Sequence, residues 1–179
     1  LLLTLHMGHG DMALVSMQYH GYKVFMVSKE FKLKWLNDLW FGMRRKSGVE
    51  FIPPRNSSFT LLRSLKKNGM VIMPFDQFTG PPIGVKTTFF GHETGTGAGL
   101  ALMAARARAP VIACCTYRRS SGKHVLVFTE RIDVVFGEDH DQSIIDYTQR
   151  FNAILEGFVR KHPDQWMWIH KRWKRFVVT

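Results

Sequence analysis

The chain has 179 residues, of which 45% are hydrophobic and 22% are charged. This composition is typical of a globular domain and disfavours the collagen, coiled-coil and disordered classes. The 25 Lys and Arg residues outnumber the 14 Asp and Glu residues, which gives a formal net charge of +11. A surplus of this size indicates an anionic partner: nucleic acid, an acidic protein, a phosphorylated substrate or an anionic membrane.

Apolar segments of strand length alternate along the chain with segments of helical periodicity. We expect strands at residues 1–5, 24–28, 49–52, 70–75, 111–117, 124–128 and 131–135, and helices at 12–20, 34–46, 57–67, 97–109 and 142–161. Such alternation predicts an α/β fold with a mixed, mostly parallel sheet flanked by helices. The last strands are expected to form an antiparallel meander. Because no linker or repeat interrupts the pattern, we expect a single domain over residues 1–179.

Two further features concern the cellular compartment. Cys114 and Cys115 are adjacent in an expected strand, so their side chains point to opposite faces and form neither a disulfide framework nor a zinc site. Free buried thiols are typical of a reducing compartment. No apolar stretch approaches the roughly 18 residues of a membrane-spanning helix. The chain begins at Leu1 inside an apolar run, from which we expect that a preceding membrane anchor is missing.

A histidine follows the first expected strand, where the catalytic groups of open α/β sheets lie. His6 is followed five residues later by Asp11. In a catalytic interpretation, His6 removes a proton from an attacking hydroxyl, and Asp11 orients the imidazole. The alternative makes His6 a buried structural residue and Asp11 a helix N-cap, since this short spacing also arises by chance. His9 is an alternative base, but no acid follows it at the same distance.

A second polar pair follows the expected strand at residues 70–75. Asp76 is a candidate to hold an arginine or a substrate hydroxyl, and Gln77 is a candidate hydrogen-bond donor. Both are therefore expected to bind substrate. The alternative is a turn in which Asp76 closes the strand by bonding to its own backbone.

Basic residues are concentrated in two regions. Residues 23–67 contain 11 Lys and Arg against three acids, and the last 23 residues contain six against one. Tryptophans lie among them, at positions 35, 40, 166, 168 and 173. This pattern leaves two alternatives to an enzyme: a basic nucleic-acid-binding domain, or a non-catalytic protein that binds an anionic membrane surface.

Several blocks, in the same order along nearly the whole chain, resemble the late acyltransferases of lipid A biosynthesis. These are the lauroyl and myristoyl transferases of Gram-negative bacteria. The blocks are His-Met-Gly-His-Gly-Asp at residues 6–11, Phe-Asp-Gln at 75–77, Phe-Phe-Gly at 89–91 and the tryptophan-rich segment at 162–174. The last is similar to the family pattern Pro-x-Gln-Trp-x-Trp-x-His-x-Arg-Trp-Lys. The resemblance implies an acyltransferase architecture like that of glycerol-3-phosphate acyltransferases.

The resemblance also implies an activity. Family members transfer a fatty acyl group from an acyl-carrier-protein thioester to a hydroxyl of a phosphorylated glycolipid, without an acyl-enzyme, a metal or a cofactor. His6 is then the general base and Asp11 its orienting carboxylate. The implied partners are acyl-carrier protein, the glycolipid acceptor and an anionic membrane surface, with no role for nucleic acid. The implied location is the cytoplasmic face of the bacterial inner membrane.

Three basic residues complete the implied site. Arg44 or Arg45, at the family's Arg-x-x-Gly-like stretch of residues 45–48, is expected to bind phosphate or to stabilise the oxyanion, because guanidinium stays charged and binds phosphate through two hydrogen bonds. Lys29 stands where the family usually has arginine, which weakens the phosphate contact expected there. The first block also departs from the family pattern His-x-Gly-Asn-Trp-Glu, since it has no Trp and ends in the shorter acid Asp11.

Overall fold

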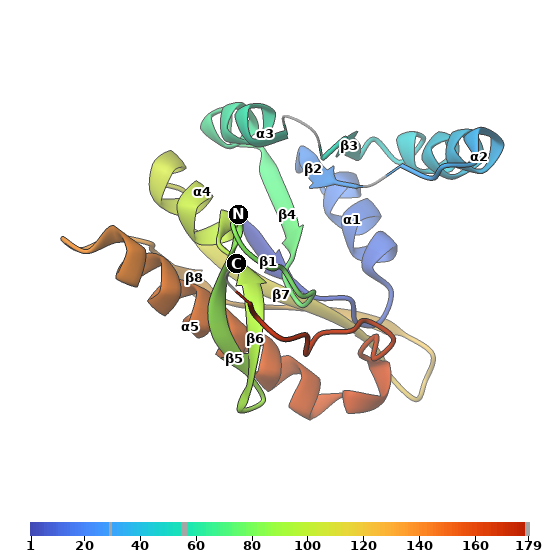
Figure 1. Cartoon of the computed structure of the whole chain (residues 1–179). Helices are drawn as coiled ribbons and strands as arrows, with labels where there is room; N and C mark the ends of the chain where they lie inside the picture. The colour runs from blue at the N-terminus through green and yellow to red at the C-terminus, as the bar shows by residue number, and fades with distance from the viewer. Residues whose placement is uncertain (29, 55–56, 178–179) are drawn as a thin grey trace.

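The computed structural model describes residues 1–28, 30–54 and 57–177. Within these ranges, six strands form a sheet in the order β3-β2-β4-β1-β7-β8 (Figure 1). All neighbouring strands are parallel except β7 and β8. The fold is therefore mixed α/β, as the alternation predicts. The strands are β1 (Leu2–Thr4), β2 (Val24–Val27), β3 (Glu50–Ile52), β4 (Met70–Pro74), β7 (Val111–Arg118) and β8 (His124–Ile132).

Helices cover both faces of this sheet (Figure 1). On one face, α1 packs on the sheet through a core that includes Leu14 and Met17. On the other face, α3, α4 and α5 share a larger core that includes Leu61, Leu100 and Phe151. Among the described residues, no helix has the length and apolar character needed to span a membrane. The helices are α1 (Gly10–Tyr19), α2 (Lys34–Arg45), α3 (Ser57–Lys66), α4 (Gly99–Ala107), α5 (His140–Lys161) and the short 3₁₀ helix η1 (Pro163–Gln165).

The central strands are apolar on both faces because helices cover both faces. Adjacent residues of one strand consequently enter different cores. Cys114 lies in the core beneath α1, and Cys115 lies in the core beneath α4 and α5. Both thiols are free and buried, and burial raises the pKa of Cys114 to about 11 and that of Cys115 to about 12. The expectation that the two cysteines face opposite ways is confirmed.

A hairpin of β5 (Gly84–Phe89) and β6 (His92–Gly97) was not expected from the sequence, for which no strand was predicted between residues 75 and 111. In β5, Thr87 and Phe89 are buried on either side of the exposed Thr88, and in β6 the three consecutive residues 94–96 are buried. Phe90 and Gly91 connect the strands, with φ angles of 51° and 76°. Two consecutive positive φ angles are typical of the tight hairpin turns that match the twist of the strands.

The prediction of a separate strand at residues 131–135 is wrong. The antiparallel meander is present as β7 and β8, but β8 is a single strand from His124 to Ile132. The separate strand expected at residues 131–135 therefore does not form. Its first two residues end β8, because the pairing with β7 continues to the start of β7, where Val111 pairs with Ile132.

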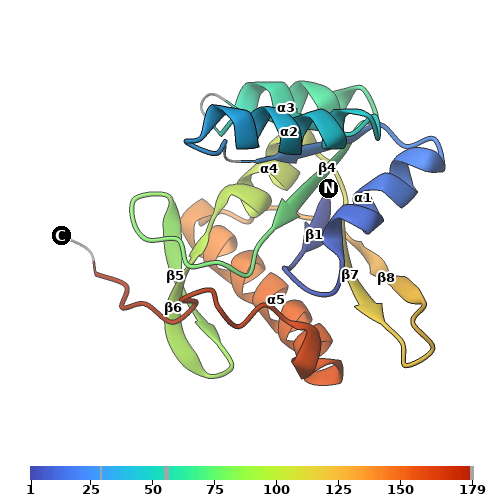
Figure 2. The ribbon, with the colours of Figure 1, turned by 90° about the vertical axis from the view of Figure 1, so that its right-hand side faces the viewer.

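The residues after α5 form a C-terminal segment, residues 162–177, that runs across the β5–β6 hairpin (Figure 2). At its start, Gln165 pairs with the backbone of Arg118 in both directions, at 2.7 and 2.9 Å. Further along, the Trp173 indole donates to the Phe89 carbonyl at 2.9 Å. The C-terminal segment is thereby held beside the carboxyl ends of the strands.

Candidate active site

Two residues distant in sequence meet at the carboxyl ends of β1 and β4. These strands are parallel neighbours, and Thr4 pairs with Pro74 in their register. Two residues further along each strand, the same register places His6 beside Asp76. The Phe75 backbone N–H donates to the Thr4 carbonyl at 2.9 Å and continues the ladder to this point. The carboxyl ends of parallel strands are where open α/β sheets bind ligands.

The Asp76 carboxylate holds His6 through two hydrogen bonds. One oxygen lies 2.8 Å from His6 Nδ1, and the other accepts from the His6 backbone N–H at 2.9 Å. A carboxylate only accepts, so the proton of the neutral imidazole lies on Nδ1. The Nε2 lone pair is then the basic site of the ring. The His6 side chain is 28% exposed and Asp76 is 0% exposed, so a hydroxyl can approach the base but not its partner.

A third hydrogen bond reaches Asp76 from the C-terminal segment. The buried Trp166 indole donates to the same Asp76 oxygen as the His6 backbone, at 2.8 Å. Burial by itself raises the pKa of the Asp76 carboxyl, but the bonds from His6 and Trp166 and the attraction to His6 outweigh it and lower the pKa. Asp76 is therefore ionised at neutral pH. Its contribution to stability is present above the usual carboxyl pKa and is lost as the pH falls through its lowered pKa.

A glycine fixes the loop between His6 and α1. Gly8 has a φ of 59°, and a Cβ at this position would collide with the Thr116 carbonyl oxygen in β7. The Thr116 hydroxyl also donates to the Met7 carbonyl at 2.8 Å. Only glycine combines this positive φ with this close approach. The loop is therefore packed tightly against β7 immediately after the candidate base.

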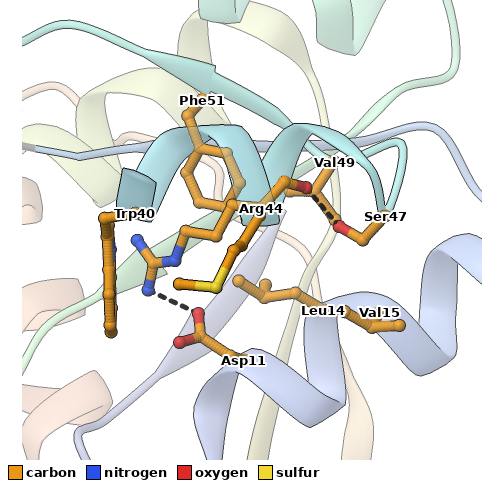
Figure 3. Close-up of a pocket in the computed structure, with 9 residues that line it drawn as sticks. Asp11, Leu14, Val15, Trp40, Arg44, Ser47, Val49 and Phe51 are labelled. Carbon is orange, nitrogen blue, oxygen red and sulfur yellow. Dashed lines mark hydrogen bonds and ion pairs between the residues drawn. The ribbon is translucent and has the colours of Figure 1, made fainter. Parts of the chain in front are cut away.

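Asp11 is not the partner of His6 Nδ1 in this structure. It lies in the first turn of α1, and its carboxylate pairs with Arg44 Nη2 of α2 at 2.5 Å (Figure 3). Successive residues at the start of a helix point in different directions, so a spacing of five residues alone does not bring Asp11 onto the imidazole. His9 caps the same helix by accepting from the Met12 backbone N–H at 3.3 Å.

Arg44 lines an apolar pocket between α1 and α2 with a volume of about 200 Å³ (Figure 3). Its guanidinium carbon lies 4.7 Å from the centre of the Trp40 ring and 4.8 Å from that of Phe51. Such contacts stabilise a partly desolvated cation. Arg44 Nε is buried and has no hydrogen-bond acceptor among the described residues. The guanidinium is thus held by Asp11 and two aromatic rings.

The other residues expected to bind substrate do not share one site with Arg44. Arg45 is exposed at the end of α2, and Gln77 is exposed beside the C-terminal segment. Asp76 binds His6 and Trp166 and is too deeply buried to hold a substrate hydroxyl, so the substrate contact expected for it is not supported. Lys29 lies outside the described residues. Within the described parts of the chain, no cluster of three His, Cys, Asp or Glu side chains is arranged to hold a metal ion.

The sequence analysis assigned no role to three residues of the C-terminal segment that the structure brings to the site. Trp166 binds Asp76, as described. The His170 ring lies 4.8 Å from the His6 ring, centre to centre, and its Nε2 lies 3.3 Å from Gln77 Nε2. The third residue, Arg172, is fully buried. All three belong to the motif at residues 162–174, and this shared position was the one sequence feature that pointed to them. Nothing in the motif indicates which strand ends the C-terminal segment contacts.

Arg172 connects the C-terminal segment to three other parts of the fold. Its Nη1 donates to the carbonyls of Gln77 at 3.2 Å and Gly95 at 2.7 Å. Its Nη2 donates to Thr96 Oγ1 at 2.7 Å and to Asn152 Oδ1 at 3.2 Å. Burial lowers the pKa of Arg172 to about 10, partly offset by the charges of Asp76 and Glu156, so it remains a cation at neutral pH. A single buried cation therefore joins the Asp76 loop, the β5–β6 hairpin and α5.

The chain is similar to one family over nearly its entire length. The family model described as bacterial lipid A biosynthesis acyltransferase matches residues 1–175. No curated protein matches the chain significantly. The family match and the basic residue at the strand ends agree with a role in transferring an acyl group to a lipid. The chain therefore belongs to the bacterial lipid A biosynthesis acyltransferases, and it is an acyltransferase.

Proposed function

We propose that this enzyme transfers a fatty acyl group from an acyl-carrier-protein thioester to a hydroxyl of a lipid A precursor or a related phosphorylated glycolipid. The observation that carries the proposal is the hydrogen bond between His6 Nδ1 and the buried Asp76 carboxylate. This bond leaves Nε2 as a base at the ligand-binding edge of the sheet. Asp76 takes the orienting role that the sequence suggested for Asp11.

In the proposed reaction, His6 Nε2 accepts the proton of the acceptor hydroxyl while its oxygen attacks the thioester carbon. The tetrahedral intermediate then expels the thiolate, the C–S bond breaks, and the proton on His6 passes to the sulfur. The products are an ester and a free thiol, with no covalent acyl-enzyme. The ionised Asp76 stabilises the imidazolium that forms between these two proton transfers.

Arg44 and Arg45 are proposed to bind the acceptor phosphate, and this role remains a prediction. The guanidinium of Arg44 already pairs with Asp11 between α1 and α2, so a phosphate competes with that carboxylate. Arg45 is exposed on the next position of the same helix. A bound phosphate gains two-point hydrogen bonding from either guanidinium, which a lysine at these positions does not provide.

The proposal is tested by incubating the purified chain with acyl-loaded carrier protein and a detergent-solubilised, phosphorylated glucosamine disaccharide with hydroxyacyl chains. We expect ester product by mass spectrometry and an equal amount of released thiol. Without acceptor, no stoichiometric thiol release is expected, because no acyl-enzyme forms. Absence of transfer together with steeply salt-dependent binding of duplex DNA would favour the nucleic-acid alternative. Vesicle binding without transfer would favour a non-catalytic surface protein.

We further propose that the enzyme acts on an anionic membrane surface, at the cytoplasmic face of the bacterial inner membrane. Exposed apolar side chains on α1 and α2 support this, with Tyr19 at 87% and Trp35 at 66% exposure. Large exposed apolar patches with basic neighbours are typical of surfaces that bind membranes. The two free thiols agree with a reducing compartment. The patch comprises Met12, Val15, Tyr19, Trp35, Leu39 and Met43, and its exposed basic neighbours include Lys23, Lys32, Lys34, Arg45 and Lys46.

The double substitution Trp35→Glu and Leu39→Glu is expected to weaken binding to phosphatidylglycerol vesicles roughly 100-fold. Each substitution removes on the order of 1.5 kcal/mol of apolar burial, and each adds a charge that an anionic surface repels. Vesicle sedimentation measures the change. The matched control is Ile83→Glu with Val135→Glu, since these side chains are even more exposed, at 73% and 74%, but line a different pocket beside α3 and α4. Equal losses in both double variants would contradict the proposed surface.

A further inference from the structure

A second imidazole packs directly against the proposed catalytic base. The His170 ring lies 4.8 Å from the His6 ring at an interplanar angle of 61°, an edge-to-face arrangement. Both side chains are partly buried. His6 and His170 are 164 positions apart in the sequence, so only the return of the C-terminal segment to the strand ends brings them together. Edge-to-face contacts between aromatic rings stabilise one relative orientation over others.

The backbone around His170 is held on both sides. On one side, the Met167 backbone N–H donates to the His6 carbonyl at 2.9 Å, and Trp166 binds Asp76. On the other side, the buried Arg172 anchors the chain, and its backbone N–H donates to the His170 carbonyl at 2.8 Å. The position of His170 beside His6 is therefore determined by buried contacts that flank it.

The His170 ring is also held through its own nitrogen. Gln77 Nε2 lies 3.3 Å from His170 Nε2, and an amide nitrogen only donates, so His170 Nε2 is the acceptor. Gln77 directly follows Asp76 in the chain. One short stretch thus holds both imidazoles, His6 through the Asp76 carboxylate and His170 through the Gln77 amide.

Catalysis by His6 requires one ring orientation. Nδ1 must meet Asp76, so that Nε2 remains the base. A half-turn of the imidazole about its terminal torsion puts Cδ2 where Nδ1 had been and so breaks the bond to Asp76, and this torsion is broad and roughly two-fold for histidine. Asp76 restrains the ring at one edge only. A ring packed against His6 adds a second restraint that opposes rotation.

We infer that His170 is a positioning residue that holds the His6 imidazole in its catalytic orientation, and that Gln77 holds His170 in turn. The inference rests on the proposed role of His6 as general base. His170 acts through the His6 ring and takes no part in the proton transfers. The sequence alone indicates no function for His170, the histidine of the C-terminal motif.

The test measures ring orientation and catalysis separately. The ¹⁵N chemical shifts of the His6 ring report its tautomer without any substrate, and steady-state kinetics with acyl-loaded carrier protein report kcat and KM. The variants are His170→Ala, which removes the ring, and His170→Phe, which keeps the packing but not the nitrogens. The control is His124→Ala, since His124 forms a similar histidine pair with His9, at 5.8 Å, away from Asp76.

We expect His170→Ala to lower kcat roughly 10-fold at nearly constant KM and to convert the single His6 tautomer into a mixture. His170→Phe is expected to restore most of both, since the ring packing returns without the Gln77 bond, and His124→Ala to change neither. An unchanged tautomer and kcat in His170→Ala overturn the inference, as does a His170→Phe variant that behaves like His170→Ala. If the tautomer responds as expected but the wild-type chain transfers no acyl group, the positioning role stands and the proposed function fails.

Discussion

Replacement of His6 with alanine is expected to lower kcat for acyl transfer about 1000-fold while leaving the fold intact. General-base catalysis contributes roughly 10²–10⁴-fold to such reactions, and the hydroxyl has no other base positioned by a buried carboxylate in the described structure. The loss is expected in kcat, because the base acts in the transition state more than in binding. Single-turnover transfer from acyl-loaded carrier protein measures it.

The matched control for this substitution is His9→Ala. His9 lies on the same loop and is the alternative base suggested by the sequence, but its ring caps α1 through the Met12 backbone N–H. Its loss is expected to cost about 1 kcal/mol of stability and to change kcat less than three-fold. Thermal unfolding establishes that both variants are folded. An equal loss of activity in the two variants, or full activity in His6→Ala, would remove His6 from the mechanism.

The same assay distinguishes the two carboxylates that compete for the orienting role. Asp76→Asn is expected to lower kcat at least 100-fold, because an amide can donate to Nδ1 and so stabilise the wrong tautomer. Asp11→Asn is expected to lower kcat less than 10-fold, since it disturbs Arg44 and not His6. The reverse order of effects would return the orienting role to Asp11.

Replacement of Arg172 with methionine is expected to lower the free energy of unfolding by about 3 kcal/mol. Methionine fills a similar length but leaves the buried Asn152 Oδ1 and the Gln77 carbonyl without their donor, and each buried acceptor left unpaired costs about 1–3 kcal/mol. Removal of a buried charge offsets part of this cost. Urea denaturation monitored by tryptophan fluorescence measures the change, and the midpoint is expected to fall.

Arg175→Met is the matched control, because Arg175 is an exposed arginine of the same C-terminal segment. Its effect on the unfolding free energy is expected to stay within about 0.5 kcal/mol. Arg172→Lys is expected to be nearly as destabilising as Arg172→Met, since one ammonium group cannot reach all the acceptors that the two ends of the guanidinium fork reach. A midpoint unchanged by Arg172→Met would show that Arg172 is not needed to hold the C-terminal segment, which its other contacts through Gln165, Trp166 and Trp173 would then hold.

Local patterns account for most of the architecture. Apolar runs with flanking helical periodicity predict the six sheet strands, and the signal is strongest for the central strands because strands covered on both faces must be apolar throughout. The β5–β6 hairpin was not predicted, because most of its buried positions are threonines and glycines. Its strands therefore lack the alternation of apolar and polar residues that predicts a strand. Hydrophobic periodicity does not register such a strand. The sequence also predicted that His6 follows a strand, and His6 remains the proposed base.

By itself, the sequence determined the fold class, the family and the residues that end the strands, since these follow from local pattern and from motifs. Which of these strand-end residues contact one another was decided by the tertiary structure alone. Neighbours in a parallel sheet are set by crossover connections and not by nearness in the chain, so β1 lies beside β4 and His6 meets Asp76, 70 positions away, rather than Asp11. The buried Arg172 brings the C-terminal segment back to the strand ends, and its Trp166 and His170 complete the site.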